Sequence, residues 1–286
     1  LFSFFLKSSS FFFYNIKLYS EKMIKSNMNL KETFTSAYQN HIQNKLGKAE
    51  DLYKQVLKVS PDHFQSIFLL GSLLIQKRNF NPAVKLLKKA IILNTKFADA
   101  FHNLGFAFVE MGEIEEGIKF FNKTIEINPK HQDVYYNLGN VMKQMGELKK
   151  SKDYYLKSIQ IQPKSNAHNN LGNIYKQLGE FKKAIDSYNK AIEISSKNSN
   201  AHFNLGNIYK QLADFNKAKE AYKKALVNDP NNLETIYNLS EINEGVLDKD
   251  LEKKLINIKE DFSISKKNIA YKNFLLSKYE LRKKNY

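Results

Sequence analysis

LGNIYKQL occurs at residues 171–178 and again at residues 205–212, an identity of eight residues at an offset of 34. Further Leu-Gly pairs, and one Leu-Ser pair, continue the series at residues 70–71, 104–105, 138–139 and 239–240. Successive pairs are 34, 34, 33, 34 and 34 residues apart. A fixed period of this length is typical of proteins that stack one supersecondary unit many times. The identity therefore indicates a repeated structural unit.

Each period contains two segments with the spacing of amphipathic helices. AHNNLGNIYKQL, residues 167–178, is followed after a short break by FKKAIDSYNKAIEI, residues 181–194. Apolar residues at i, i+3, i+4 and i+7 place one face of each helix toward the interior, as Leu171, Ile174 and Tyr175 do. Each period is predicted to be a helical hairpin, with a first and a second helix.

Glycine and proline mark the ends of these helices. A left-handed residue is expected just past each first helix, at Gly112, Gly146 and Gly179, and at Asn44 in the earliest unit. Proline stops helix propagation, and it follows the second helices at Pro61, Pro129, Pro163 and Pro230. Pro82 is expected at the first helical position after Asn81 as the N-cap.

The composition excludes several classes of site. The chain has 286 residues, of which 42% are hydrophobic, which is enough for a sizeable core. Cysteine is absent, so a disulfide framework, a zinc-thiolate site and a thiol nucleophile are all excluded. A cytoplasmic location is the simplest prediction from this composition.

The net charge is +16, from 45 Lys and Arg against 29 Asp and Glu. A basic balance of this size can indicate a nucleic-acid or membrane partner. The excess is spread along the chain, and its one concentration comprises Lys77, Arg78, Lys85, Lys88, Lys89 and Lys96. A solvated Lys-rich surface is therefore favoured over a nucleic-acid interface.

The N-terminal segment, residues 1–28, is Phe- and Ser-rich and lies outside the period. Lys7 and Lys17 interrupt it, so it has no uninterrupted stretch of the roughly 18–20 apolar residues that a membrane span needs. No small-residue cleavage site follows it. An over-extended reading frame is favoured over a membrane anchor.

Seven positions that recur together carry a family resemblance. In one copy they are His202, Leu205-Gly206, Tyr209, Ala218, Tyr222, Ala225 and Pro230. This pattern resembles the tetratricopeptide repeat (TPR), over residues 29–244, in about six repeats plus the leading half of a seventh. The resemblance implies an all-α fold, a right-handed superhelical solenoid of hairpins whose first helices line a concave groove. Gly117 and Ser151 replace the small Ala, so those copies are expected to pack more loosely.

Polar residues that packing does not require recur on the first helices. Asparagine precedes the Leu-Gly or Leu-Ser pair at Asn103, Asn137, Asn170, Asn204 and Asn238. Three residues further on are Asn140, Asn173 and Asn207, followed by Lys143, Lys176 and Lys210. In TPR proteins these positions face the groove, and a similar asparagine ladder in protein O-GlcNAc transferases holds an extended peptide. The resemblance therefore implies a peptide-binding groove at these eleven residues.

The chemistry of the side chains agrees with this implication. An amide has both a donor and an acceptor, so repeated amides can pair with successive peptide groups whatever the peptide's side chains. The lysines would favour acidic segments. The alternative is that Asn recurs because the repeats were duplicated in an Asn-rich chain. Phe106 and Leu69 do not supply the carboxylate clamp of chaperone-binding TPR domains.

No sequence pattern for catalysis is present. The phosphate-binding, dinucleotide-binding, nucleophile-elbow and zinc-protease patterns are all missing from the chain. His168 and His202 are one repeat apart, and packed helices are separated by about 8–10 Å, so the two imidazoles are too far apart to share a metal. The chain is predicted to be non-enzymatic, without a cofactor.

After Asn243 the period ends, and residues 245–286 have helical spacing without a Leu-Gly pair. Asp248 and Ser263 or Ser265 are candidate N-caps, and Ile269, Phe274, Leu275 and Tyr279 form an apolar face. A helical cap over the last repeat is one interpretation. The other rests on residues 273–286, NFLLSKYELRKKNY, which resemble the connector of bacterial TPR-sulfotransferase proteins and suggest a truncated chain.

Three functional hypotheses follow. The leading one is a non-catalytic scaffold that binds proteins or peptides. The second is the substrate-recruiting region of a sulfotransferase or an O-GlcNAc-type glycosyltransferase, whose catalytic domain would lie beyond residue 286. The third is a nucleic-acid binder, whose affinity should fall steeply with salt.

Overall fold

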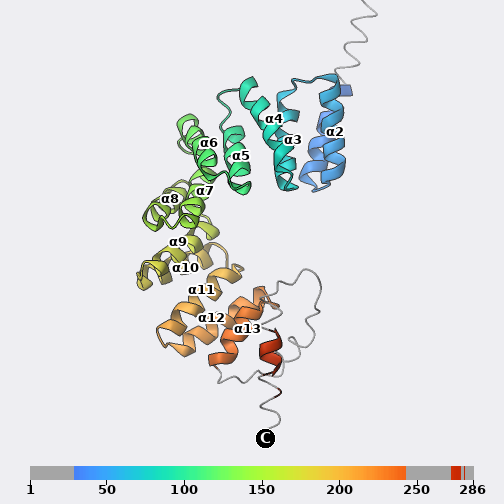
Figure 1. Ribbon diagram of the computed structural model, residues 1–286. Coiled ribbons are helices and arrows are strands. Elements are labelled where there is room, and N and C mark those ends of the chain that lie inside the picture. The colour runs from blue at the N-terminus through green and yellow to red at the C-terminus, as the bar shows by residue number, and fades with distance from the viewer. Residues whose placement is uncertain (1–28, 243–271, 278–279, 281–286) are drawn as a thin grey trace, which may run out of the picture. The chain divides into compact units, whose positions relative to one another are not determined.

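The computed structural model describes residues 29–242, 272–277 and 280, and all regular structure within them is α-helical (Figure 1). A helix covers residues 29–42. It is followed by α2 (Leu46–Val59), α3 (Phe64–Gln76), α4 (Phe80–Leu93), α5 (Ala98–Glu110), α6 (Ile114–Ile127), α7 (Gln132–Gln144), α8 (Leu148–Ile161), α9 (Ser165–Gln177), α10 (Phe181–Ile194), α11 (Ser199–Gln211), α12 (Phe215–Asn228) and α13 (Leu233–Ile242). Residues 272–277 form a further helical segment.

The helices pair in the order that the period predicts. The chain divides into two compact units, residues 1–131 and 132–286. In the first unit α3 packs on α4 and α5 on α6; in the second, α7 packs on α8, α9 on α10 and α11 on α12. Each second helix also packs on the following first helix within its unit, as α4 does on α5 and α10 on α11. The predicted all-α fold of stacked TPR hairpins is confirmed.

Glycine lets the two helices of a hairpin come close together. A Cβ atom on Gly172 would lie 2.5 Å from Cε1 of Tyr188, and one on Gly206 would lie 2.6 Å from Cδ1 of Tyr222. These distances are shorter than carbon atoms tolerate. The Leu-Gly pair is therefore needed because a large second-helix ring rests directly on the first-helix backbone.

The turns within the hairpins use left-handed residues, as expected. Gly112, Gly146 and Gly179 have φ values of 87°, 79° and 76°, and Asn44 has 58°. Arg78 and Ala213 occupy the matching turns with φ values of 57° and 58°. Residues that carry a Cβ atom are disfavoured at positive φ. Two turns therefore hold a left-handed conformation that the sequence does not favour locally.

Two sequence expectations need correction. The N-cap of α4 is Asn79 and the helix begins at Phe80, so Pro82 is its third residue. Proline fits there because the N–H groups of the first turn have no intrahelical partner.

The expected looser packing at Gly117 and Ser151 is also wrong. A Cβ on Gly117 would lie 2.9 Å from the Gly105 carbonyl oxygen and 2.5 Å from Cγ2 of Val109, so α5 and α6 approach closely. Ser151 is fully buried and donates its hydroxyl to the Gly139 carbonyl oxygen at 2.8 Å.

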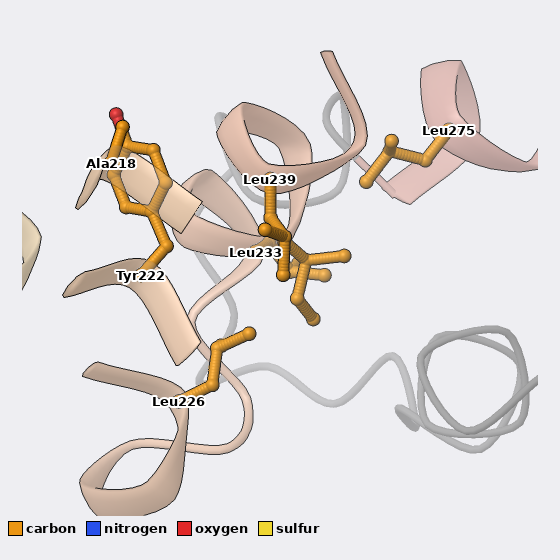
Figure 2. Packing of buried hydrophobic residues seen from close by; sticks show 7 residues of the cluster. Ala218, Tyr222, Leu226, Leu233, Leu239 and Leu275 are labelled. Carbon is orange, nitrogen blue, oxygen red and sulfur yellow. The ribbon is translucent and has the colours of Figure 1, made fainter. Parts of the chain in front are cut away.

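The helical segment at residues 272–277 packs on the last described first helix. Leu275 is buried in a cluster with Leu233 and Leu239, and Figure 2 shows its side chain pointing toward these two residues. The ring of Phe274 lies 5.7 Å from the ring of Tyr237. This part of the C-terminal region therefore covers apolar surface of α13. The candidate positions Asp248, Ser263, Ser265, Ile269 and Tyr279 lie outside the described residues, as does the N-terminal segment 1–28.

Within the described residues, no helix has both the length and the apolar character that crossing a bilayer requires.

Candidate peptide-binding surface

All eleven predicted groove residues lie on first helices, and each has intermediate exposure. Asn103 is on α5 in the first unit. The other ten are on α7, α9, α11 and α13 in the second unit. The second unit therefore holds nearly all of the candidate surface.

The asparagines that precede the Leu-Gly pairs make hydrogen bonds within the protein. Nδ2 of Asn103 donates to Oγ of Ser72 at 2.8 Å. Nδ2 of Asn170 lies 3.1 Å from Oδ1 of Asn140 and 3.2 Å from the Tyr136 hydroxyl. Each of these bonds joins one first helix to the preceding first helix. The row thus stabilises the stacking of hairpins through donors that the sequence assigned to a peptide.

Two further members of this row complete the pattern in the second unit. Nδ2 of Asn204 donates to Oδ1 of Asn169 at 3.0 Å, and Oδ1 of Asn238 accepts from Nζ of Lys210 at 2.9 Å. Asn169 is buried and was not singled out from the sequence; its own Nδ2 lies 3.4 Å from Oδ1 of Asn170. Asn137 occupies the matching position on α7.

The second row of asparagines accepts hydrogen bonds from buried tyrosines. The hydroxyls of Tyr155, Tyr188 and Tyr222 donate to Oδ1 of Asn140, Asn173 and Asn207 at 2.6, 2.7 and 2.7 Å. All three tyrosines are fully buried, and burial raises the pKa of each hydroxyl above its usual value. A buried phenol needs an acceptor, and the amide oxygen supplies it.

Two hairpins of the first unit lack both members of this pair. At the position of Tyr155 they have Phe121 and Leu87, which carry no hydroxyl group, and at the position of Asn140 they have Phe106 and Ser72. The earliest hairpin is an exception, because Tyr53 is buried there and its hydroxyl lies 3.4 Å from Nδ1 of His41. Asparagine therefore accompanies the tyrosine in the three hairpins α7–α8, α9–α10 and α11–α12, and this joint occurrence is a signal that could have revealed the pairing.

The lysines of the candidate surface lack the carboxylate partners that lysines near the start of the second helices have. Lys183 pairs with Glu180, and Lys217 pairs with Asp214 at 2.8 Å. By contrast, neither Lys143 nor Lys176 forms an ion pair within the described part of the chain. Lys210 donates to an amide, so its charge is also uncompensated. The first helices of the second unit therefore carry uncompensated positive charge.

The concentrated basic stretch in the first unit behaves differently. Nζ of Lys77 lies 2.6 Å from Oε2 of Glu50, and Nη2 of Arg78 lies 3.0 Å from Oε2 of Glu110. Lys89 pairs with Asp62 at 2.8 Å. Half of the six basic residues are thus paired with carboxylates, which weakens the case for a phosphate-binding patch there.

The histidines that the sequence places one repeat apart are part of the packed interior. His168 and His202 are buried, and burial lowers the pKa of both imidazoles. His131 lies 3.0 Å through Nε2 from Oδ1 of Asp99, and this hydrogen bond lowers the pKa of Asp99. No group of three or more potential metal ligands gathers in the described residues.

Comparison with known proteins identifies the repeat. Family models described as "TPR repeat" match residues 107–146 and 172–212, and models described as "Tetratricopeptide repeat" match residues 64–96, 132–165 and 199–232. The solved structure of MamA is 30% identical, over 56% of this chain and 95% of MamA, with a TM-score of 0.50. The chain belongs to the tetratricopeptide-repeat family.

Other TPR structures share the fold at lower identity. YrrB is 19% identical over 65% of this chain and 96% of its own, with a TM-score of 0.52. The pilF protein of Pseudomonas aeruginosa is 17% identical over 75% of this chain and 97% of its own, with a TM-score of 0.62. No curated protein matches the sequence.

Proposed function

We propose that this TPR chain is a non-catalytic scaffold that binds extended peptide segments of partner proteins. The proposed contact surface, here called the Asn-Lys surface, consists of Asn140, Lys143, Asn173, Lys176, Asn207 and Lys210 on α7, α9 and α11. The observation that carries the proposal is that three successive hairpins present the same amide and the same uncompensated ammonium group. A surface with such a repeat suits a ligand whose own groups repeat, as a peptide backbone does.

The hydrogen bonds within the protein leave specific atoms for a ligand. Oδ1 of Asn207 is occupied by Tyr222, but its Nδ2 donates to no other described residue. Conversely, Asn204 uses its Nδ2 for Asn169 and keeps Oδ1 available. The two residues lie one turn apart on α11, so together they offer one donor and one acceptor. A peptide group needs that combination.

The proposal also includes the other asparagines that precede the Leu-Gly and Leu-Ser pairs. In the second unit Asn170 and Asn238 belong to it as positioning residues, because their bonds to Asn140 and Lys210 join adjacent first helices, and Asn137 has the same position on α7. Asn103 has this role within the first unit, through its bond to Ser72. The lysines add a preference for acidic peptide segments, because Lys143 and Lys176 have no carboxylate partner in the described chain. A cytoplasmic location, with its pool of protein partners, is part of the proposal.

Two observations from relatives support this proposal. YrrB, which shares the fold, is described as a TPR protein with an unusual peptide-binding site. MamA is 30% identical to this chain and is matched along 95% of its own length, so the two proteins share the repeat architecture.

The test is binding to selected peptides. A random 12-residue peptide library would be selected on the full chain, and affinities of enriched peptides measured by fluorescence anisotropy. The decisive variant combines Asn140→Asp, Asn173→Asp and Asn207→Asp, which keeps an acceptor for each tyrosine hydroxyl and removes the Nδ2 donor. We expect at least tenfold weaker binding of uncharged selected peptides with unchanged helicity. A library that yields no peptide, or undiminished affinity in the variant, would refute the proposal.

The recruiting region of a transferase remains the alternative proposal. It rests on the resemblance of residues 273–286 to a sulfotransferase connector. The reading frame downstream of residue 286 tests it directly, because a sulfotransferase or O-GlcNAc-type domain there would be recognisable by its own nucleotide-binding sequence patterns.

A further inference from the structure

The period has one irregularity, and it lies in the second unit. The connection from α8 to α9 has three residues, 162–164, whereas the corresponding connections at 60–63, 94–97, 128–131, 195–198 and 229–232 have four. Each four-residue connection contains a turn, and the short one contains none. The N-cap of α9, Lys164, is extended with φ −121° and ψ 139°. The missing residue therefore changes the local path of the backbone.

A cleft of about 560 Å³ opens at this connection. Its walls come from the beginnings of α7, α9 and α11 and from the connections that precede α9 and α11. They include Asp133, Tyr136, Lys164, Asn166, Lys197 and Asn200. A volume of this size is in the range of pockets that hold small ligands, so a peptide side chain fits within it. Nearly every lining side chain is polar, which suits a polar occupant.

The charges of the cleft favour an anion. Nζ of Lys164 lies 2.7 Å from Oδ1 of Asp133, so these two charges neutralise each other across the cleft. Lys197 forms no ion pair with any residue that the structure describes, and it is exposed. Its ammonium group is therefore the uncompensated charge among the lining residues.

Asn170 links the cleft wall to the proposed peptide-binding surface. The hydroxyl of Tyr136, in the cleft wall, accepts from Nδ2 of Asn170 at 3.2 Å. Nδ2 of Asn170 also lies 3.1 Å from Oδ1 of Asn140, on the Asn-Lys surface. A peptide bound at Asn140 would therefore be next to a residue that hydrogen-bonds the cleft wall.

We propose that the cleft receives the carboxylate of one Asp or Glu side chain of the bound peptide. Lys197 supplies the charge, and the amides of Asn166 and Asn200 supply hydrogen-bond donors. The inference rests on the proposed function and adds to it a specific subsite. Because the Asn-Lys surface repeats in three hairpins, it allows several peptide registers. The cleft borders the one shortened connection between hairpins in the described chain, so an acidic side chain seated there selects the register that brings it to this site.

The test uses two fluorescein-labelled probes, (Ser-Glu-Ala)4 and its (Ser-Gln-Ala)4 counterpart, with the full chain. Two variants address the cleft: Lys197→Gln removes the charge, and a glycine inserted between Pro163 and Lys164 restores a four-residue connection. Lys223→Gln is the matched control, because Lys223 is exposed on α12, outside both the cleft and the Asn-Lys surface. Equal melting temperatures would show that the variants fold.

We expect the wild type to bind the Glu probe at least tenfold more tightly than the Gln probe. Each cleft variant should reduce this ratio at least fivefold, and the control should keep it. Cleft variants that retain the full ratio would overturn the cleft subsite and leave peptide binding intact. A wild type that prefers neither probe would overturn the subsite together with the acidic preference assigned to Lys143 and Lys176. A wild type that binds neither probe would overturn both proposals.

Discussion

The hydroxyl of Tyr188 donates to Oδ1 of Asn173 at 2.7 Å, joining the buried ring of a second helix to the exposed face of a first helix. The pair recurs as Tyr155 with Asn140 and as Tyr222 with Asn207, always 15 residues apart. One asparagine therefore has two functions: its oxygen satisfies the core, and its amide nitrogen faces outward. A substitution that changes only the amide oxygen should affect core stability, and one that changes only the amide nitrogen should affect ligand binding.

Replacing Asn173 with Phe should destabilise the protein. The Tyr188 hydroxyl would lose its acceptor in a buried position, which costs about 1–3 kcal/mol. The double variant Asn173→Phe with Tyr188→Phe copies the Phe106 and Phe121 pair of the first unit and should recover much of that loss. Urea denaturation of the two single variants and the double variant gives the coupling free energy. A coupling near zero would show that the hydrogen bond does not matter.

Ala213→Gly should stabilise the protein by about 0.5–1 kcal/mol, because an L-residue at positive φ is strained and glycine is not. Ala213 has φ of 58° in the turn where Gly179 has 76°. The reverse change, Gly179→Ala, is the matched control and should lower the free energy of unfolding by a similar amount. Thermal unfolding followed by circular dichroism measures both. A lower melting temperature for Ala213→Gly would contradict the strain argument.

Gly117→Ala should destabilise the first unit by about 1–3 kcal/mol through overpacking. The new Cβ would lie 2.9 Å from the Gly105 carbonyl oxygen, a backbone atom that cannot move aside easily. Alanine is the better helix former by about 1 kcal/mol, so this preference works against the effect. Gly47→Ala is the control, since a Cβ at Gly47 meets no atom within 4 Å. It should be neutral or stabilising in the same urea titration.

Stability should decline as the pH rises above about 10. Burial raises the pKa of Tyr53 to about 12 and raises the pKa values of Tyr155, Tyr188 and Tyr222 as well. A raised pKa means that the unfolded chain loses these protons first, so the stabilisation is complete below pH 10 and is lost above it. Tyr188→Phe should lessen the decline. The melting temperature from pH 8 to 11.5 measures it, and parallel curves for both proteins would refute the assignment.

Stability should also decline as the pH falls below about 6.5. Burial lowers the pKa of His168 and of His202, so the unfolded chain takes up protons that the folded chain resists. The contribution is therefore complete above the unfolded pKa and is lost as the pH falls through it toward the folded pKa. A His168→Phe, His202→Phe variant should show a flatter profile between pH 7 and 5. An unchanged slope would place the acid sensitivity on other groups.

Much of the fold could be predicted from the sequence because the packing is local. Helix α10 covers residues 181–194, as the apolar spacing indicated, and the glycines at positions 112, 146 and 179 adopt the predicted turn. Each hairpin contacts only its neighbours, so one period of sequence contains nearly all the information about one period of structure. The error at Pro82 concerned the residue at which α4 begins, because proline is compatible with any position in the first turn. The error at Gly117 arose because the cost of an exchange there depends on the exact separation of two helices.

The sequence by itself determined that asparagine and lysine recur on the first helices, because a residue that returns at a fixed period can be placed on the same helix face in each repeat. Only the tertiary structure decided what each atom does. Oδ1 of Asn173 accepts from Tyr188, Nδ2 of Asn204 donates to Asn169, and a cleft lies between the α8–α9 and α10–α11 connections. The physical reason is that the partner of each amide lies on another helix. The sequence alone does not reveal whether that partner engages the amide oxygen or the amide nitrogen.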